Sequence, residues 1–150
     1  MEVKVKKLNE NAVIPTYAHP GEDAGLDLTA TSYHYDIEND CHIYGTGLAF
    51  EIPKGHVGLL FPRSSNRKTD AYMANHVGVI DSGYRGEVML SFKHRDSTRD
   101  SVFAEQLRPY EIGDRVAQLI IIPYPQIELK EVDELEDSNR GETGHGSSGK

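Results

Sequence analysis

Cysteine is nearly absent from the 150-residue sequence, and long hydrophobic runs are missing altogether. With Cys41 alone, one chain can build neither a disulfide framework nor an all-thiolate metal site. No segment approaches the roughly 18 apolar residues of a transmembrane helix, and residues 1–7 alternate charge and valine where a signal peptide would have an apolar core. We therefore expect a soluble, intracellular (cytoplasmic) protein with no membrane partner.

Basic residues are also in short supply. Lysine and arginine number 16 against 24 aspartate and glutamate residues, which gives a formal net charge of −8. This sign disfavours binding to nucleic acid. It is compatible with an anionic small molecule if clustered arginines, backbone N–H groups or a metal ion offset the repulsion locally. The seven histidines show no HxxH or HExxH spacing, so no hydrolytic zinc site is predicted.

The hydrophobic pattern favours strands over helices. A chain of 16.7 kDa suits one domain, and residues 116–122 form a nearly continuous apolar run that predicts a strand buried on both faces. A short helix is conceivable at residues 67–73. Alternation with a period of two predicts further strands at residues 2–6, 47–52, 56–61 and 87–93. Turn signals follow or separate these runs at 19–21, 39–40, 53–55, 81–83 and 111–114, which is typical of an all-β sandwich or barrel.

The chain ends in a polar tail. Residues 137–150 contain no aliphatic or aromatic hydrophobe, so burial cannot repay the entropy of ordering them. One interpretation is a disordered end or linker. The other is a mobile arm that closes over an anionic ligand, with glycine N–H groups, Arg140, Ser147 and Ser148 as donors. We predict a β-domain over residues 1–136 and a flexible arm over 137–150.

Residues 78–87 form the densest candidate for chemistry. We interpret them as a β-hairpin whose Ser-Gly turn follows Asp81 and whose second strand begins at Tyr84. Asp81 is either a turn-forming aspartate or a general base on a rigid mount. Tyr84 is either a half-buried strand aromatic or a platform for a ligand.

Three further segments carry polar groups in places that need explaining. Residues 61–68 place Arg63, Ser64 and Ser65 in a cationic loop, which suits either phosphate binding or solvent exposure. Asp27 lies between two leucines and needs a partner if it is buried, but not if it faces water at a sheet edge. Gln118 interrupts an apolar strand, and a hydrogen bond to the backbone would explain it.

Taken in order, five segments resemble the motifs of the trimeric dUTP pyrophosphatase (dUTPase) family. They span residues 24–149, which is most of the chain. Five motifs in the same order are far more specific than any one of them. The segments are Ala24-Gly25-Leu26-Asp27-Leu28, Pro62-Arg63-Ser64-Ser65, Gly78-Val79-Ile80-Asp81 with Tyr84-Arg85-Gly86, Gly113-Asp114-Arg115-Val116-Ala117-Gln118, and Arg140-Gly141 through Gly149.

The resemblance implies a fold, an assembly and a reaction. It implies a jelly-roll-like β-barrel that forms a homotrimer with three active sites at subunit boundaries. The substrate would be dUTP, hydrolysed to dUMP and pyrophosphate with Mg²⁺ bound to the triphosphate. Hydrolysis at phosphorus needs positioning and charge neutralisation more than covalent chemistry, which agrees with these residue types.

The resemblance also implies roles for individual residues. Asp81 would activate the water that attacks the α-phosphorus, and Tyr84 would lie under the deoxyribose. Asp27 would hold a Mg²⁺-bound water. Other residues are implied to bind substrate: the uracil edge by Asn75, Gly78 and Ile80; the phosphates by Arg63, Ser64, Ser65 and Gln118; and the closing arm by Arg140, His145, Gly146, Ser147 and Ser148.

Two positions depart from the family pattern, and two other functions compete. The family usually has glycine where Ser65 stands and phenylalanine where His145 stands, so a His145→Phe exchange is predicted to lower KM for dUTP near neutral pH. A dCTP deaminase with the same barrel would release ammonia and normally uses a glutamate. A trimer acting mainly as a regulatory protein-binding module would not need an intact Asp81 and Arg140.

Overall fold

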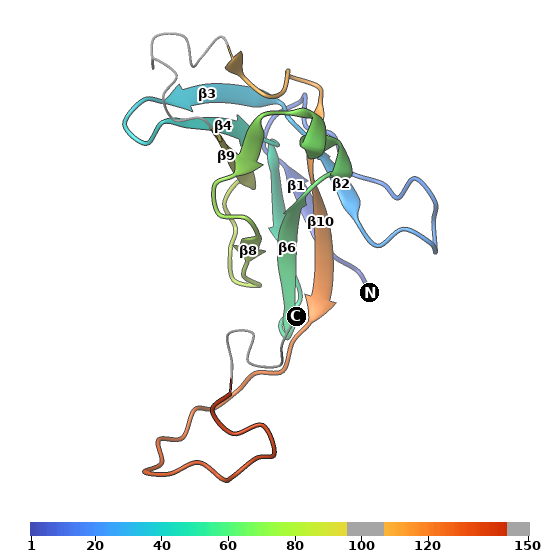
Figure 1. The fold of residues 1–150 in the computed structure, drawn as a ribbon. Helices are drawn as coiled ribbons and strands as arrows, with labels where there is room; N and C mark the ends of the chain where they lie inside the picture. Colours follow the sequence, from blue (N-terminus) through green and yellow to red (C-terminus); the bar gives the residue numbers. More distant parts are fainter. Residues whose placement is uncertain (96–106, 144–150) are drawn as a thin grey trace.

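The computed structural model describes residues 1–95 and 107–143, and within them the chain is almost entirely β-structure (Figure 1). Helical structure among these residues is limited to 3₁₀ turns, namely η1 (Ser64–Lys68) and Leu107. The strands are β1 (Lys4–Lys7), β2 (Leu26–Thr29), β3 (Ser32–Asp36), β4 (Cys41–Gly45), β5 (Leu48–Glu51), β6 (His56–Pro62), β7 (Ala71–Met73), β8 (Gly78–Ile80), β9 (Met89–His94) and β10 (Arg115–Pro123). None of the described residues forms a helix long and apolar enough to cross a membrane.

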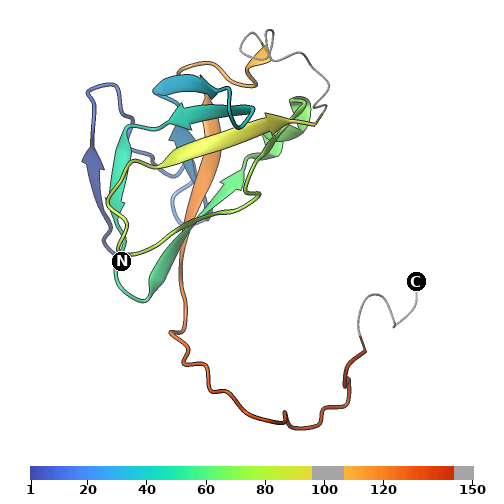
Figure 2. The same cartoon turned by 90° about the vertical axis from the view of Figure 1, so that its left-hand side faces the viewer.

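Two four-stranded antiparallel sheets form the body of the protein. One has the strand order β2-β10-β6-β8, the other has β3-β4-β9-β7, and β1 pairs with β5 in a short ribbon. Neighbouring strands are often distant in sequence, as β10 lies between β2 and β6. Figures 1 and 2 show the two sheets stacked across a common interior. The predicted all-β, jelly-roll-like fold is therefore confirmed.

The core lies between the inner faces of these sheets. Leu60 and Leu119 are buried from one sheet. Tyr44 and Phe92 are buried from the other, with ring centroids 5.9 Å apart in an edge-to-face contact. The Tyr44 hydroxyl donates to the Tyr110 carbonyl over 2.9 Å, so this buried polar group has a partner. Alternate residues of β7 and β9 supply the core, whereas β4 and β5 bury consecutive residues, so the period of two is visible in only some of the strands.

The strands predicted from alternation are confirmed, with shifts of up to two residues at their ends. They correspond to β1, β5, β6, β9 and β10. Burial of β10 on both faces is right only for its first half, because Val116, Ala117 and Leu119 are buried but Ile122 is 40% exposed. The short helix considered for residues 67–73 is wrong in position: η1 ends at Lys68, and residues 71–73 form β7.

The predicted hairpin over residues 78–87 is also wrong. The turn at residues 82–83 exists, and the Tyr84 N–H donates to the Asp81 carbonyl over 3.0 Å. However, β8 pairs with β6 in one sheet, whereas β9 begins only at Met89 and pairs with β4 and β7 in the other. Residues 81–88 therefore cross from one sheet to the other. A single sequence shows that a strand exists but not which strand lies beside it.

The chain leaves the body after β10. The Tyr124 N–H donates to the Gly55 carbonyl over 2.9 Å, and residues 124–143 are exposed and form no strand. In both views this segment projects away from the sheets (Figures 1 and 2). The extended stretch thus begins earlier than residue 137, while the division at 136/137 stays a prediction.

Candidate active site

Asp27 is the centre of a cluster that joins three strands. It lies on β2, at the edge of its sheet, and accepts hydrogen bonds from Arg63 Nε at 2.8 Å and from Arg115 Nη1 at 3.2 Å. Its side chain is 30% exposed, and that of Arg63 is 24% exposed. A half-buried carboxylate between two guanidiniums is held in place, yet it keeps lone pairs for a further donor such as water.

Gln118 lies beside Asp27 because β10 places the two residues in register. It faces Asp27 on β2 and Phe61 on β6, and its Nε2 donates to the Pro62 carbonyl over 3.2 Å. The backbone partner predicted for this amide is therefore present. A Cβ on Gly25 would stand 2.6 Å from Gln118 Oε1, so the glycine makes room for the amide.

Ser64 and Ser65 stand on η1, directly after β6. Arg63 Nη1 donates to Ser65 Oγ at 3.4 Å and to the Arg115 carbonyl at 3.4 Å. The Tyr110 hydroxyl donates a hydrogen bond of 2.7 Å to Asn66 Oδ1, which anchors η1. Burial raises the pKa of Tyr110, so this phenol stays a donor at neutral pH.

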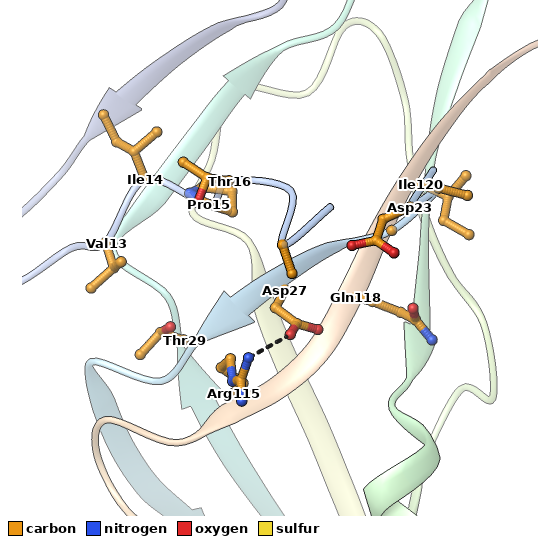
Figure 3. Close-up of a pocket in the computed structure, with 13 residues that line it drawn as sticks. Val13, Ile14, Pro15, Thr16, Asp23, Asp27, Thr29, Arg115, Gln118 and Ile120 are labelled. Atoms are coloured by element: carbon orange, nitrogen blue, oxygen red, sulfur yellow. Dashed lines mark hydrogen bonds and ion pairs between the residues drawn. The ribbon is translucent and has the colours of Figure 1, made fainter. Parts of the chain in front are cut away.

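A hollow of about 510 Å³ opens beside this cluster (Figure 3). Asp23, Asp27, Arg115 and Gln118 line its polar side, and Ile14 and Ile120 lie on its apolar side. Figure 3 draws Asp27 toward Arg115, with Gln118 further along β10. The hollow combines oxygen ligands, an arginine and an amide, a set that suits a hydrated cation and phosphate oxygens.

Asp81 and Tyr84 lie in a second hollow of about 280 Å³, on the crossover between the sheets. Both residues are exposed. Within residues 1–95 and 107–143 the Asp81 carboxylate forms neither a hydrogen bond nor an ion pair, so its oxygens are open to solvent. The Tyr84 hydroxyl donates to the Glu87 carbonyl over 2.9 Å, which fixes the ring beside Asp81. This hollow presents a proton acceptor next to an aromatic face.

Of the residues expected to read a base, only Ile80 lines this second hollow within the described part of the chain. Asn75 is exposed in the turn before β8, and Ile80 lines the hollow itself. Gly78 is buried and pairs with Leu60, and a Cβ there would lie 3.0 Å from Leu60 Cδ1. Gly78 and Ile80 thus lie on β8, the strand that leads into Asp81, and Asn75 lies in the turn before that strand.

The two groups of residues stand apart within one chain. Ile80 pairs with Gly58 near the start of β6, whereas Ser64 follows the end of the same strand. At about 3.3 Å per residue, Asp81 and Ser64 are roughly 20 Å apart along β6. Figure 1 shows β8 alongside the middle of β6 and η1 beyond the end of that strand. One chain alone does not bring the predicted base to the predicted phosphate ligands.

The predicted arm residues are separate from both groups. Arg140 is exposed on the projecting segment, where its Nε donates to the Thr143 carbonyl over 3.0 Å within a local turn. His145, Gly146, Ser147 and Ser148 lie outside the described residues. The structure therefore places the predicted site residues in three regions: the Asp27 cluster, the Asp81 crossover and the arm.

Three residues that contact or support the predicted site residues were not predicted from the sequence. Arg115 was seen only as part of a motif, yet it binds Asp27 from 88 residues away. Tyr110 supports η1, and Glu87 lies beside Tyr84. A charged residue at the start of an apolar strand was the only signal for Arg115, and no local signal pointed to the other two. In the described part of the chain, no three His, Cys, Asp or Glu side chains gather as a metal-binding group.

Comparisons with known proteins identify the family. The sequence model of the dUTPase family matches residues 10–149. Over 150 residues the chain is 37% identical to the deoxyuridine 5′-triphosphate nucleotidohydrolase of Nocardia farcinica, covering 98% of this chain and 85% of that protein. It is 38% identical over 151 residues to the protein of the same name from Nautilia profundicola, covering 100% of both.

Solved structures resemble the whole fold. A mutant dUTPase of Staphylococcus bacteriophage 80alpha, solved with dUpNHpp, superposes with a TM-score of 0.75 at 32% identity, covering 99% of this chain and 98% of that one. A mutant dUTPase from phage phi11 of S. aureus, described as revealing the coordination of a structural Mg(II) ion, gives a TM-score of 0.69 at 28% identity, covering 91% and 100%.

Proposed function

The chain belongs to the dUTPase family, and we infer from that premise that it is a dUTP diphosphatase, which hydrolyses dUTP to dUMP and pyrophosphate. The observation that carries this function is the exposed, unbonded Asp81 carboxylate beside Tyr84, in a chain whose relatives bear that activity in their names. Each further assignment below is part of the same proposal.

Asp81 acts as the general base. A water molecule gives a proton to its carboxylate while the water oxygen attacks the α-phosphorus, and pyrophosphate leaves. A base positioned in this way contributes roughly 10²–10⁴-fold. The exposure of Asp81 and its lack of a partner among the described side chains support the role, because a carboxylate tied to an arginine would be a poorer proton acceptor.

The Asp27 cluster receives the triphosphate. Arg63, Ser64, Ser65 and Gln118 offer the N–H and O–H donors that phosphate oxygens accept. Asp27 fits a role toward Mg²⁺ through a bound water, since this hard cation prefers oxygen ligands and keeps part of its water shell. When bound, the ion would neutralise charge on the triphosphate. Donors and cation together offset a chain charge of −8.

Tyr84 selects the sugar. Its ring is fixed at the hydroxyl end by the Glu87 carbonyl, so it can lie flat under a deoxyribose and leave no room for a 2′-hydroxyl. Asn75, Gly78 and Ile80 flank that position and are suited to the uracil edge.

A complete site needs more than one copy of the chain. The roughly 20 Å between Asp81 and Ser64 exceeds any contact distance needed for attack at one phosphorus. A homotrimer with sites at subunit boundaries would place the crossover of one chain against the Asp27 cluster of another. The projecting segment, with Arg140 and residues 145–148 beyond it, would close over the triphosphate at such a boundary.

Substrate range tests the reaction. Pyrophosphate release is measured with dUTP, dCTP, dTTP and UTP, with and without Mg²⁺, together with ammonia release from dCTP. We expect release from dUTP, stimulated by Mg²⁺, and no ammonia. Asp81→Asn should bind dUTP but lose turnover by about 10²-fold or more. Ammonia from dCTP, or a fully active Asp81→Asn enzyme, would contradict the proposal.

Mixed oligomers test the shared site. Asp81→Asn chains and Ser64→Ala/Gln118→Ala chains are each expected to be impaired. After the two proteins are unfolded together and refolded, about one quarter of the boundaries should combine two intact halves, which restores that share of the wild-type turnover. Mixing that restores nothing would place the whole site in one chain.

A further inference from the structure

The crossover that carries Asp81 and Tyr84 has few partners of its own. Residues 81–88 join no ladder, since the strands on either side pair in different sheets. Arg85 closes the turn by donating from Nη1 to the Ser82 carbonyl at 2.7 Å and to the Tyr84 carbonyl at 2.9 Å. These contacts are internal to the loop, so they do not position it on the body.

Glu87 supplies a side-chain link to the body. Its Oε1 accepts a hydrogen bond of 2.7 Å from the Gly47 N–H, at the start of β5. The carboxylate lies against the Gly45–Gly47 backbone, because a Cβ on Gly45 would lie 2.5 Å from the same oxygen. Gly47 adopts a φ of +66°, a left-handed conformation that aims its N–H at the carboxylate and that glycine accepts without strain.

The main chain of the same residue holds the Tyr84 ring. The Tyr84 hydroxyl donates to the Glu87 carbonyl over 2.9 Å. A Cβ on Gly86 would overlap that hydroxyl, so the ring is closely packed against the 86–87 peptide. A continuous chain of contacts thus runs from Gly47 through the Glu87 side chain and carbonyl to the tip of the Tyr84 ring.

We propose that Glu87 is a positioning residue that fixes the Tyr84 ring and thereby sets how strongly the enzyme rejects a sugar with a 2′-hydroxyl. The inference rests on the proposed function, in which Tyr84 lies under the deoxyribose. Val88 is tied to β5 independently, by its N–H to the Leu48 carbonyl at 2.9 Å. The Glu87 carbonyl belongs to the same peptide as the Val88 N–H, so this peptide has two anchors. Loss of the Glu87 carboxylate removes one of them and lets the peptide tilt, which would loosen the ring without detaching the crossover.

The readout is discrimination, the ratio of kcat/KM for dUTP to kcat/KM for UTP. Glu87→Ala should lower this ratio about tenfold, within the roughly 100-fold that a displacement of about 1 Å at a positioned group can cost. Glu87→Gln keeps an oxygen acceptor for the Gly47 N–H and should stay within about threefold of wild type. Glu87→Asp keeps the charge but shortens the side chain, and should resemble Glu87→Ala.

A purely structural role gives a different pattern. It would lower kcat/KM for dUTP and UTP by the same factor and leave the ratio unchanged, which would overturn the inference. The matched Gln and Asp variants decide the question even if Glu87→Ala fails to fold. A Glu87→Gln variant as undiscriminating as Glu87→Asp would also overturn it.

A double-mutant cycle with Tyr84→Phe locates the effect. Without the hydroxyl, the ring no longer bonds the Glu87 carbonyl, so adding Glu87→Asp should change the ratio less than twofold. An undiminished effect in that background would show that Glu87 acts elsewhere. Wild-type protein that releases no pyrophosphate from dUTP would refute the proposed function instead, and the two failures are thus distinguishable.

Discussion

Acidification should destabilise this protein through one buried histidine. His42 is 1% exposed. Its ring stacks on Tyr33, lies at a tilt to Tyr35 and meets His94 edge to face. The Tyr33 hydroxyl lies 3.1 Å from its Nδ1, and within the described residues the buried Nε2 has no hydrogen-bond partner. Burial, helped by the nearby His94 ring, lowers the pKa of His42 from 6.5 to about 4.

The sign and the size follow from that pKa. Between pH 6.5 and pH 4 the unfolded chain binds a proton at this position and the folded chain does not, so the free energy of unfolding falls as the pH falls. Each pH unit in this window costs about 1.4 kcal/mol. Lowering the pH from 7 to 5 should therefore remove about 2 kcal/mol per chain through His42 alone.

Urea denaturation at pH 7, 6 and 5, at one fixed protein concentration, measures this term. His42→Asn keeps an amide for the Tyr33 hydroxyl but cannot titrate, so its loss of stability over this range should be about 2 kcal/mol smaller than that of the wild type. His34→Asn removes an exposed imidazole from β3 and serves as the matched control. Identical pH slopes for wild type and His42→Asn would refute the reasoning.

Three further predictions concern the Asp27 cluster and the single thiol. Gly25→Ala would place a Cβ 2.6 Å from Gln118 Oε1 and break the hydrogen bond from Gln118 to the Pro62 carbonyl. We expect KM for dUTP to rise about three- to tenfold, as in Gln118→Ala. An unchanged KM would contradict this prediction. A lysine at position 63 cannot bond Asp27, Ser65 and the Arg115 carbonyl together. Arg63→Lys should therefore lower the free energy of unfolding in urea by about 1 kcal/mol, nearly as much as Arg63→Ala. If Arg63→Lys were as stable as the wild type, the charge alone would matter. Cys41 is 4% exposed, its thiol donates to the Phe92 carbonyl, and burial raises its pKa. A thiol reagent should therefore label Cys41 in urea but not in the native protein. Rapid labelling of the native protein would show that β4 opens.

Several features could be read from the sequence because they depend on neighbours along the chain. Alternation revealed β6 and β9, where every second residue faces the core. Turn residues revealed the chain reversal at 39–40, where Asp40 adopts a φ of +49°. The flanking strands β3 and β4 were overlooked, since their tyrosines and histidines alternate with polar residues and do not form an obvious apolar stripe.

Other features depend on which strands lie side by side, and these required the structure. The hairpin at residues 78–87 was predicted from a turn between two strands, yet each strand found a partner in a different sheet. Likewise, the carboxylate of Asp27 was noticed, but its two arginines come from β10 and from the end of β6. Strand pairing is settled by packing the whole core, and no local pattern encodes it.

By itself, the sequence determined an all-β chain, the positions of several strands and turns, and the kinds of side chain available for binding phosphate and accepting a proton. Those properties follow from periodicity and residue chemistry, which are local. Only the tertiary structure decided that Asp27, Arg63, Arg115 and Gln118 meet, and that Asp81 stands at the other end of β6. The physical reason is that the pairing of distant strands is a property of the folded core as a whole. The pairing of β2, β10 and β6 brings the Asp27 cluster together, and the pairing of β8 with β6 places Asp81 away from that cluster.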